Sequence, residues 1–176
     1  MKYKSISLSG PVAAGTTTAA KTLSQKLNLQ YHSAGEFFRK YMKEHNIPLP
    51  NKEEIPDDEE RSLDEKLTKL LASKKPVVVD GLYTGYFARD MKHVLKVLIT
   101  ADEQTRIQRA IDRAQSETAQ DVKKRDAAHD AKFRKLYASV NFLDPKFFDL
   151  VIDNTNLEPE AVVEKITDEF LSNGSS

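Results

Sequence analysis

The segment Gly10–Thr18 (GPVAAGTTT) constrains the fold of this chain more than any other part of the sequence. It follows an alternating run, Lys4–Ser9, that predicts a strand, and Thr16–Leu27 predicts the helix after it. Two glycines separated by four residues, between a strand and a helix, are typical of the phosphate-binding loop G-x-x-x-x-G-K-[ST]. The strand–loop–helix order therefore predicts an α/β fold whose first loop binds phosphate.

Each part of this loop has a chemical task. Glycine lets the backbone curl so that N–H groups point at phosphate oxygens, and the positive end of the following helix faces the same anion. Thr17 or Thr18 supplies a hydroxyl for Mg²⁺, whereas Thr16 stands where the pattern has lysine. A glycine-containing turn that binds nothing is the alternative. The predicted nucleotide-binding residues are Gly10, Pro11, Ala13, Ala14, Gly15, Thr16, Thr17 and Thr18.

Composition limits the class of protein. At 176 residues the chain suffices for one domain, predicted over residues 1–172, with a frayed tail at 173–176. A formal net charge of zero argues against a nucleic-acid polymer as partner, and the lack of cysteine excludes disulfides and thiolate zinc sites. The sequence has no apolar run of membrane-spanning length and no signal-peptide core. We expect a soluble, cytoplasmic protein that acts as a monomer.

Five short apolar runs alternate with helical patterns along the chain. The runs lie at Ile6–Ser9, Leu29–His32, Val77–Asp80, Val94–Thr100 and Leu150–Asp153. The helical patterns lie at Ala34–His45, Arg61–Ser73, Glu103–Gln115, Val122–Val140 and Glu158–Leu171. This alternation predicts a five-stranded parallel sheet flanked by helices, with ligands at the carboxyl ends of the strands. The segment Ile47–Glu60, with three prolines and a run of acids, predicts an exposed connector; a functional lid is the alternative.

Two of the predicted strands end in residues that suit the same site. Asp80-Gly81 follows a buried apolar run, where a carboxylate can orient Mg²⁺ through its water shell; a simple Asp-Gly turn is the alternative. Ser33 is a good helix N-cap, and Glu36 completes a capping box, which is a sufficient structural reason for both residues. Arg39, one turn later, points into the cleft or to solvent, and the pattern does not decide between the two.

Basic side chains gather in the second half of the chain. Arg106, Arg109 and Arg113 share one helix face because they are spaced by three and four residues. A second set follows at Lys123, Lys124, Arg125, Lys132 and Arg134. The polar segment Gln115–Gln120 between the two sets is typical of the short lid of a phosphoryl-transfer enzyme, which stabilises phosphate charge and excludes water. A solvated helical hairpin with internal salt bridges is the alternative.

Together these motifs resemble those of the cytidylate kinases, above all the short archaeal type, within the P-loop nucleoside monophosphate kinase family. The resemblance extends from Lys4 to about Phe170 and is carried by Gly10–Thr18, Ser33-Ala34-Gly35 with Phe38-Arg39, Asp80-Gly81 with Gly85, Leu98–Ala101 before the three arginines, and Phe148–Asp153. It implies a P-loop NTPase fold with an acceptor-binding region at about 33–73 and a lid at 113–125. It also implies transfer of the γ-phosphate of ATP to CMP or dCMP, with Mg²⁺.

The resemblance also implies roles for single residues. The acceptor nucleotide would lie at Ser33, Gly35, Arg39, Asp64 and Gly81. The catalytic centre would contain Arg109, Arg113, Arg125, Lys132 and Asp80, and the metal ion would lie at Thr17 and Asp80. Three positions depart from the family: Leu82 replaces an arginine that holds the acceptor phosphate, Lys132-Phe133 replaces Arg-Tyr, and His129 replaces a glutamate. Arg89 and Arg134 are candidate replacements for the lost cations.

Two other functions stay open on the sequence. Leu82 keeps open a kinase for another nucleoside monophosphate, such as AMP or UMP, or for the hydroxyl group of a small metabolite. Thr16, Leu82 and Lys132 together keep open a nucleotide-binding protein that has lost catalysis and acts as a sensor or partner-binding module.

Overall fold

The computed structural model describes residues 2–73, 75–113 and 117–172. The strands are β1 (Ser5–Ser9), β2 (Gln30–Ser33), β3 (Val77–Asp80), β4 (Val94–Thr100) and β5 (Leu150–Asp153). The α-helices are α1 (Thr16–Leu27), α2 (Ala34–Glu44), α3 (Asp57–Ala72), α4 (Thr84–Phe87), α5 (Glu103–Arg113), α6 (Ala119–Leu136) and α7 (Pro159–Ser172). Two short 3-10 turns are η1 (Lys52–Glu54) and η2 (Pro145–Phe147). The predicted elements agree with these to within about one turn, apart from α4, which no sequence pattern predicts.

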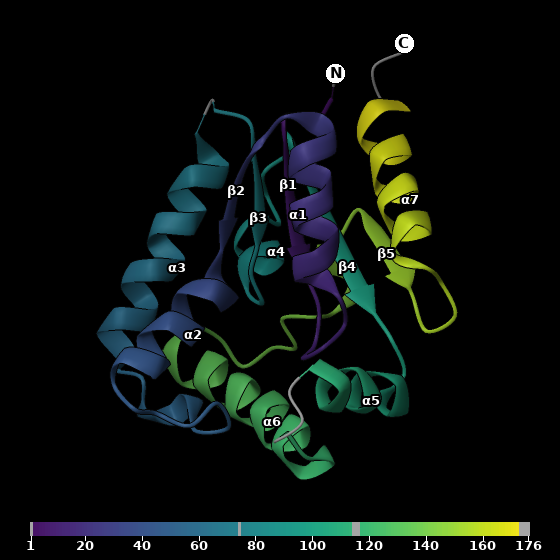
Figure 1. Ribbon diagram of the computed structural model, residues 1–176. Helices are drawn as coiled ribbons and strands as arrows, with labels where there is room; N and C mark the ends of the chain where they lie inside the picture. Colours follow the sequence, from purple (N-terminus) through teal and green to yellow (C-terminus); the bar gives the residue numbers. More distant parts are fainter. Residues whose placement is uncertain (1, 74, 114–116, 173–176) are drawn as a thin grey trace.

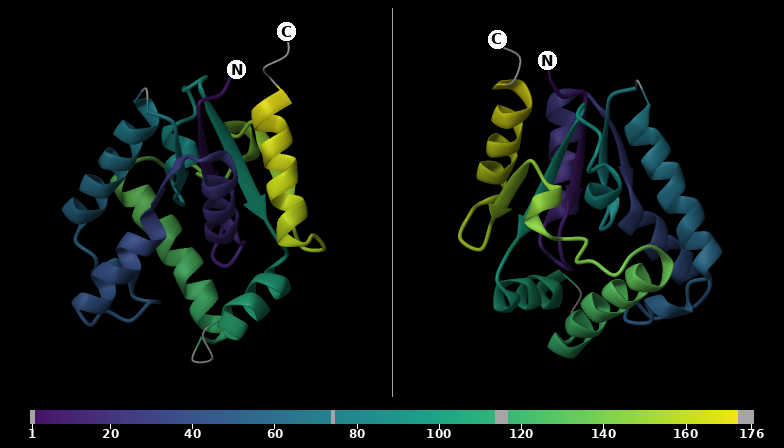
Figure 2. Two further views of the ribbon diagram at one scale, coloured as in Figure 1. Left: turned by 45° about the horizontal axis from the view of Figure 1, so that its top comes forward. Right: turned by 180° about the vertical axis from the view of Figure 1, so that it is seen from behind.

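The five strands form one parallel sheet in the order β2-β3-β1-β4-β5 (Figure 1). β1 pairs with β3 on one side and β4 on the other, so that Ile6 lies opposite Val78 and Leu95. Helices α1 and α7 cover one face of the sheet, and α3 and α4 lie on the other (Figure 2). The predicted fold class, a five-stranded parallel sheet flanked by helices, is confirmed.

The residues of β1 alternate between these two faces. Ile6 and Leu8 are buried in the core beneath α1 and α7. Ser7 and Ser9 are buried on the opposite face, where Ser9 Oγ donates a 2.7 Å hydrogen bond to the carbonyl oxygen of Gly81. Because serine is small, the turn after β3 packs closely against β1. This contact fixes the Asp80-Gly81 turn beside the loop that follows β1.

The segment 47–60 differs from the exposed connector that the sequence predicts. Lys52 is 6% exposed, Ile55 is 1% exposed and Glu60 is fully buried. The acidic run does not remain a loop, because α3 starts at Asp57 with four carboxylates in its first turn, where the helix dipole favours negative charge. The segment packs against α6 through η1 and is an integral part of the structure.

Helices α5 and α6 lie beyond the carboxyl ends of the strands, on the same side as the loop after β1 (Figures 1 and 2). Thr118 caps α6 in a reciprocal capping box with Asp121. The predicted lid, 113–125, falls at the junction of these two helices, and its residues 114–116 lie outside the described part of the chain. Within the described ranges, the model contains no helix with the length and apolar character needed to cross a membrane.

Candidate active site

The loop between β1 and α1 has the backbone conformation of a phosphate cradle. Gly15, directly before α1, has a φ of 94°, and Ala13 has a φ of 61°. A Cβ atom on Gly10 would lie 2.3 Å from the carbonyl oxygen of Ile99 in β4, so glycine is required at this close approach. The loop therefore presents the positive end of α1 at the carboxyl edge of the sheet.

Side chains from α5 and α6 hold this loop in place. Arg106 Nη1 donates to the carbonyl oxygen of Val12 at 2.9 Å and to Asp126 Oδ2 at 2.8 Å. Asp126 Oδ1 in turn accepts a 3.0 Å hydrogen bond from the backbone N–H of Val12. Arg106 is thus occupied in supporting the loop. Asp126, which no sequence motif identifies, ties the loop to the helix that follows the lid.

Asp80 lies at the carboxyl end of β3, next to the first turn of α1. Its Oδ2 accepts hydrogen bonds from Thr17 Oγ1 at 2.6 Å and from Ser33 Oγ at 3.3 Å. Burial raises the pKa of the Asp80 carboxyl, and hydrogen bonds from the hydroxyls of Thr17, Thr16 and Ser33 act against that shift. Thr17 and Asp80 thereby place two oxygen ligands side by side.

These two oxygens fit a magnesium ion. Mg²⁺ prefers hard oxygen ligands and in phosphoryl-transfer sites takes one or two of them from the protein and the rest from water and phosphate. Among the described residues, no group of three or more His, Cys, Asp or Glu side chains forms a metal cage. The pair Thr17 and Asp80 therefore suits an ion that arrives with a nucleotide.

One cavity runs from the phosphate loop to the segment 47–60. Its lining contains most of the predicted site residues, namely Gly10, Pro11, Ala13, Gly15, Thr16, Thr17, Thr18, Gly35, Arg39, Asp64, Asp80, Gly81, Arg113 and Arg125. Four predicted residues, each within the described ranges, lie outside this lining: Ala14, Ser33, Arg109 and Lys132. The fold thus brings the loop, the end of β3, the start of α2 and two arginines of the predicted lid into one hollow.

Three arginines line this cavity from three helices: Arg39 of α2, Arg113 at the end of α5 and Arg125 of α6. The Arg125 side chain is 11% exposed and forms an ion pair with Glu117, which also lies 3.5 Å from Arg113 Nη2. Burial lowers the pKa of Arg125; Glu117 opposes this shift, while the positive charges of Arg113 and Arg39 add to it. An anion in the cavity would relieve this repulsion between like charges.

Arg109 lies on the other side of the phosphate loop. Its Nη1 donates to Asn154 Oδ1 at 2.9 Å, and Asn154 Nδ2 donates to the carbonyl oxygen of Ala14 at 2.8 Å. Arg109 borders a second hollow, which opens beside Gly15 and Thr18 and is bounded by residues 154–159. Arg109 and Asn154 therefore connect the loop to the chain after β5, and no motif identifies Asn154.

Lys132 joins α6 to the segment 47–60. Its ammonium group donates a 2.6 Å hydrogen bond to the carbonyl oxygen of Ile55 and lies 2.8 Å from Asp57 Oδ1. The side chain is buried and also lies near Glu60. These three partners lie on α3 and on the segment just before it. Lys132 therefore has a structural role, because it holds α6 against that segment.

Leu82 lines the cavity at the position where the resemblance implies an arginine. Neither candidate replacement is part of the lining that the described residues form. Arg134 pairs with Asp130 at the surface of α6. Arg89 donates to the carbonyl oxygen of Tyr86 and lies over its ring.

Lys52 is a cavity cation that the sequence patterns do not reveal. Its Nζ lies 2.7 Å from Glu60 Oε1 and 4.1 Å from the centre of the Phe38 ring. Buried ammonium groups need a charge partner, and Glu60 provides it. The surrounding prolines and acids have neither helical nor strand periodicity, so nothing in the sequence places this lysine inside.

The end of the cavity away from the loop has apolar walls. They are formed by Phe38, Met42, Leu49, Ile55 and Tyr83. Asp64 and His129 add polar atoms. Tyr137 donates a 2.6 Å hydrogen bond to Asp64 Oδ2, and burial raises the pKa of the Asp64 carboxyl to about 7. Flat apolar walls with a few directional polar groups are typical of a small-molecule pocket.

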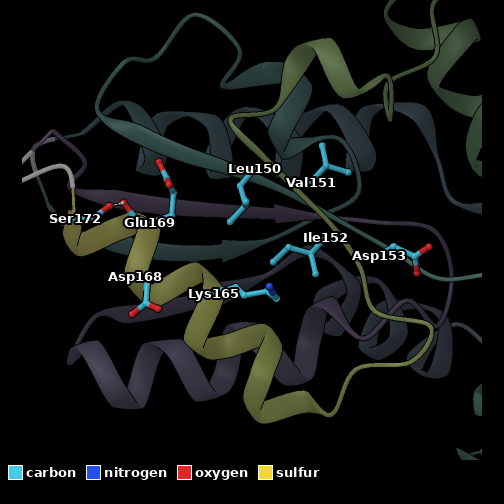
Figure 3. A pocket seen from close by; sticks show the side chains of 8 residues that line it. All are labelled: Leu150, Val151, Ile152, Asp153, Lys165, Asp168, Glu169 and Ser172. Atoms are coloured by element: carbon cyan, nitrogen blue, oxygen red, sulfur yellow. Dashed lines mark hydrogen bonds between the residues drawn. The ribbon is translucent and has the colours of Figure 1, made fainter.

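A further hollow lies at the open edge of the sheet, between β5 and α7 (Figure 3). It is lined by Leu150, Val151, Ile152 and Asp153 of the strand and by Lys165, Asp168, Glu169 and Ser172 of the helix. Its polar groups are mostly carboxylates, and its lining comes from β5 and α7 alone. It is therefore separate from the cavity at the phosphate loop.

Residues 5–156 of the chain match the cytidylate kinase-like family. A protein named cytidylate kinase from Sulfolobus acidocaldarius is 30% identical over 167 residues, which cover 92% of this chain and 91% of that protein. Another of that name from Ignicoccus hospitalis is 31% identical over 167 residues, covering 90% of this chain and 94% of that protein. The matches thus span nearly the whole chain.

Solved structures show the same fold at low sequence identity. A gluconokinase from Sinorhizobium meliloti has a TM-score of 0.64 at 14% identity, with 99% of both chains covered. A shikimate kinase from Acinetobacter baumannii has a TM-score of 0.59 at 17% identity, covering 99% of this chain and 96% of that one. These likenesses concern the fold, which is that of small P-loop kinases.

Proposed function

This chain belongs to the cytidylate kinase-like family, as its sequence motifs indicate, and we propose that it transfers the γ-phosphate of ATP to CMP or dCMP. The family makes the chain a phosphotransferase of the nucleoside monophosphate kinase type. The observation that carries the proposal is the cavity itself, which joins the phosphate loop to an apolar pocket and contains three arginines where the two meet.

In this proposal ATP lies on the loop side. Its phosphates face the backbone N–H groups of residues 10–18 and the positive end of α1. Its base lies in the second hollow, between Arg109 and residues 154–159, because that hollow opens directly beside Gly15 and Thr18. Arg109 then contributes to donor binding, and Ala14 contributes through the carbonyl bond that fixes Asn154.

Thr17 and Asp80 would hold the magnesium ion that accompanies ATP. The ion supplies neutralisation of phosphate charge when it is bound. Thr17 and Ser33 orient the Asp80 carboxylate through their hydroxyl hydrogen bonds, so Ser33 acts on the metal site as well as capping α2. The ion's positive charge favours the ionised form of Asp80, against the effect of burial.

The acceptor nucleotide lies at the other end, with its phosphate near Gly35, Arg39 and Gly81 and its base among the apolar walls. Arg39, Arg113 and Arg125 draw the two phosphates together and neutralise charge during in-line transfer. An oxygen of the acceptor phosphate attacks the γ-phosphorus as the bond to the bridging oxygen breaks, and ADP leaves. No covalent intermediate with the protein is needed.

The described lining of the cavity contains four cations, although the motif positions Thr16 and Leu82 carry none. They are Arg39, Lys52, Arg113 and Arg125. Because phosphoryl transfer depends on positioning and charge neutralisation, the source of the positive charge matters less than its place. Lys132 stabilises the wall behind this site rather than touching the phosphates.

The experiment that tests this proposal is an ADP-release assay with ATP, Mg²⁺ and each nucleoside monophosphate in turn. We expect turnover with CMP and dCMP that exceeds turnover with UMP, AMP and GMP by at least about tenfold, the scale of one well-placed hydrogen bond. Arg125→Ala is the matched variant, and its turnover should fall by about a hundredfold or more.

Two other results of this assay would indicate a different function. Turnover with another acceptor alone would keep the kinase and reject cytidylate as its substrate. ATP binding without turnover on any acceptor would reject catalysis and favour a nucleotide-binding regulatory protein, which Thr16 and Leu82 already suggest on the sequence.

A further inference from the structure

His129 lines the apolar end of the cavity with a ring nitrogen that has no partner. Its Nδ1 is buried and has no hydrogen-bond partner among the described residues. The backbone oxygen of His129 accepts a 2.8 Å hydrogen bond from the Tyr83 hydroxyl, which fixes this part of α6 against the cavity wall. A buried polar atom without a hydrogen-bond partner is energetically costly, so the position is one that a ligand atom would satisfy.

The surroundings of His129 keep its imidazole uncharged. Burial lowers its pKa well below 6.5, and the positive charges of Lys52 and Arg125 act in the same direction. A neutral imidazole offers one directional hydrogen bond at each nitrogen instead of a charge. It is therefore suited to an uncharged polar atom, whereas phosphate groups in the same cavity meet arginines.

The groups around His129 indicate which part of a nucleotide would bind beside it. Phe38 and Tyr83 present flat rings, and Met42 and Ile55 add apolar surface. Aromatic and apolar walls accept a planar base, and a ribose phosphate gains little from them. A base in this place would bring its polar edge to His129.

We propose that His129 binds the acceptor base, its Nδ1 forming a hydrogen bond with the base of a bound pyrimidine nucleoside monophosphate. This inference rests on the proposed function, because it requires the acceptor to occupy the end of the cavity away from the phosphate loop. His129 stands where the family resemblance implies glutamate, and a neutral imidazole, unlike a carboxylate, can donate a hydrogen bond as well as accept one.

The test compares ligands with and without a base. Binding of CMP, of ribose 5-phosphate and of ATP is measured by calorimetry for the wild type and for His129→Phe and His129→Asn. Phenylalanine keeps the flat shape and removes Nδ1, whereas the asparagine amide places a polar atom close to the Nδ1 position. His45→Phe is the control, since His45 lies on the exposed end of α2 and bonds the carbonyl oxygen of Tyr41.

We expect His129→Phe to weaken CMP binding by at least about tenfold while ribose 5-phosphate and ATP change by less than about twofold. His129→Asn should recover CMP affinity to within about threefold of the wild type. The inference is overturned if His129→Phe binds CMP as the wild type does, or if CMP and ATP weaken together.

The proposed kinase function and the proposed role of His129 can be rejected independently of each other. A wild type that binds CMP without phosphorylating it rejects the kinase function and still allows the His129 comparison. A wild type that phosphorylates CMP, with unchanged CMP affinity in His129→Phe, rejects the role of His129 alone. A wild type that binds no nucleoside monophosphate rejects both.

Discussion

The carboxyl group of Asp64 couples the stability of this fold to pH. It is buried between α3 and the cavity, its pKa is raised to about 7 by burial, and Tyr137 donates a hydrogen bond to it. In the unfolded chain the same group titrates near 3.8. Between these two values the folded chain binds the extra proton, so the free energy of unfolding falls as the pH rises through about 7.

Asp64→Asn should remove this dependence, because the amide is neutral at every pH and still accepts from Tyr137. Between pH 5 and pH 8 the free energy of unfolding of the wild type should fall by about 2–3 kcal/mol more than that of the variant. This figure corresponds to the two pH units between pH 5 and the folded pKa, at about 1.4 kcal/mol per unit. Urea unfolding of both proteins at these two pH values measures the difference. An equal pH dependence of wild type and variant would contradict the assignment of a raised pKa to Asp64.

Single residues differ in how far the sequence reveals their place. Gly10 and Gly15 are predictable because their spacing follows from backbone geometry, and the structure shows the close approach and the positive φ that require glycine. Lys52 and His129 are not predictable in this way. Their places in the cavity lining depend on Glu60 and on the packing of α6 against the segment 47–60, which are contacts between distant parts of the chain.

At the scale of elements, Glu117 links the last residue of α5 to α6 through two arginines. Glu117 is buried and pairs with Arg125, and it also lies within salt-bridge distance of Arg113. Both arginines line the cavity where phosphates are proposed to bind. A phosphate bound there would therefore compete with Glu117 for the same two cations.

Glu117→Gln should raise the affinity of the protein for inorganic triphosphate by at least about threefold, because the arginines lose their internal anion. Calorimetry at constant ionic strength measures the change. Asp112→Asn is the control, since Asp112 lies on the exposed side of α5 and accepts a hydrogen bond from Gln108. Weaker triphosphate binding in Glu117→Gln would show instead that Glu117 positions the arginines for the ligand.

Elements with a clear pattern are predictable, and those built by tertiary packing are not. The runs Val77–Asp80 and Val94–Thr100 are apolar apart from Lys96 and the polar residues at their ends, as buried parallel strands are, and both are strands over these bounds. The prolines of the segment 47–60 interrupt any period, so the pattern predicts an exposed connector. The carboxylates from Asp57 onward nevertheless suit the start of a helix, and α3 begins there. The short α4 depends on the small serines of β1, which a local pattern cannot show.

At the scale of the whole molecule, strand order decides where the site lies. β1 lies between β3 and β4, so the loop after β1 meets the end of β3 on one side and the start of α5 on the other. After β1 the chain places β2 and β3 on one side of this strand and then β4 and β5 on the other. A reversal of this kind leaves a crevice at the carboxyl edge of a parallel sheet. The place of the site follows from the alternation of strands and helices, whereas its acceptor end depends on how α2, α3 and α6 pack.

The central claim is that the phosphates of donor and acceptor meet in one cavity, so that the γ-phosphate passes directly between the two nucleotides. The measurement that tests it most directly is calorimetric binding of a bisubstrate compound in which adenosine and cytidine are joined by five phosphates. We predict one molecule per chain and an affinity at least about a hundredfold higher than that of ATP or CMP, because one ligand fills both ends.

Gly15→Val is the control for this measurement, since a side chain at a φ of 94° is strained and would disturb the cradle. The variant should lose the gain in affinity while circular dichroism shows that it remains folded. A bisubstrate compound that binds the wild type no more tightly than ATP alone would contradict the claim that the phosphates of the two nucleotides meet in one cavity.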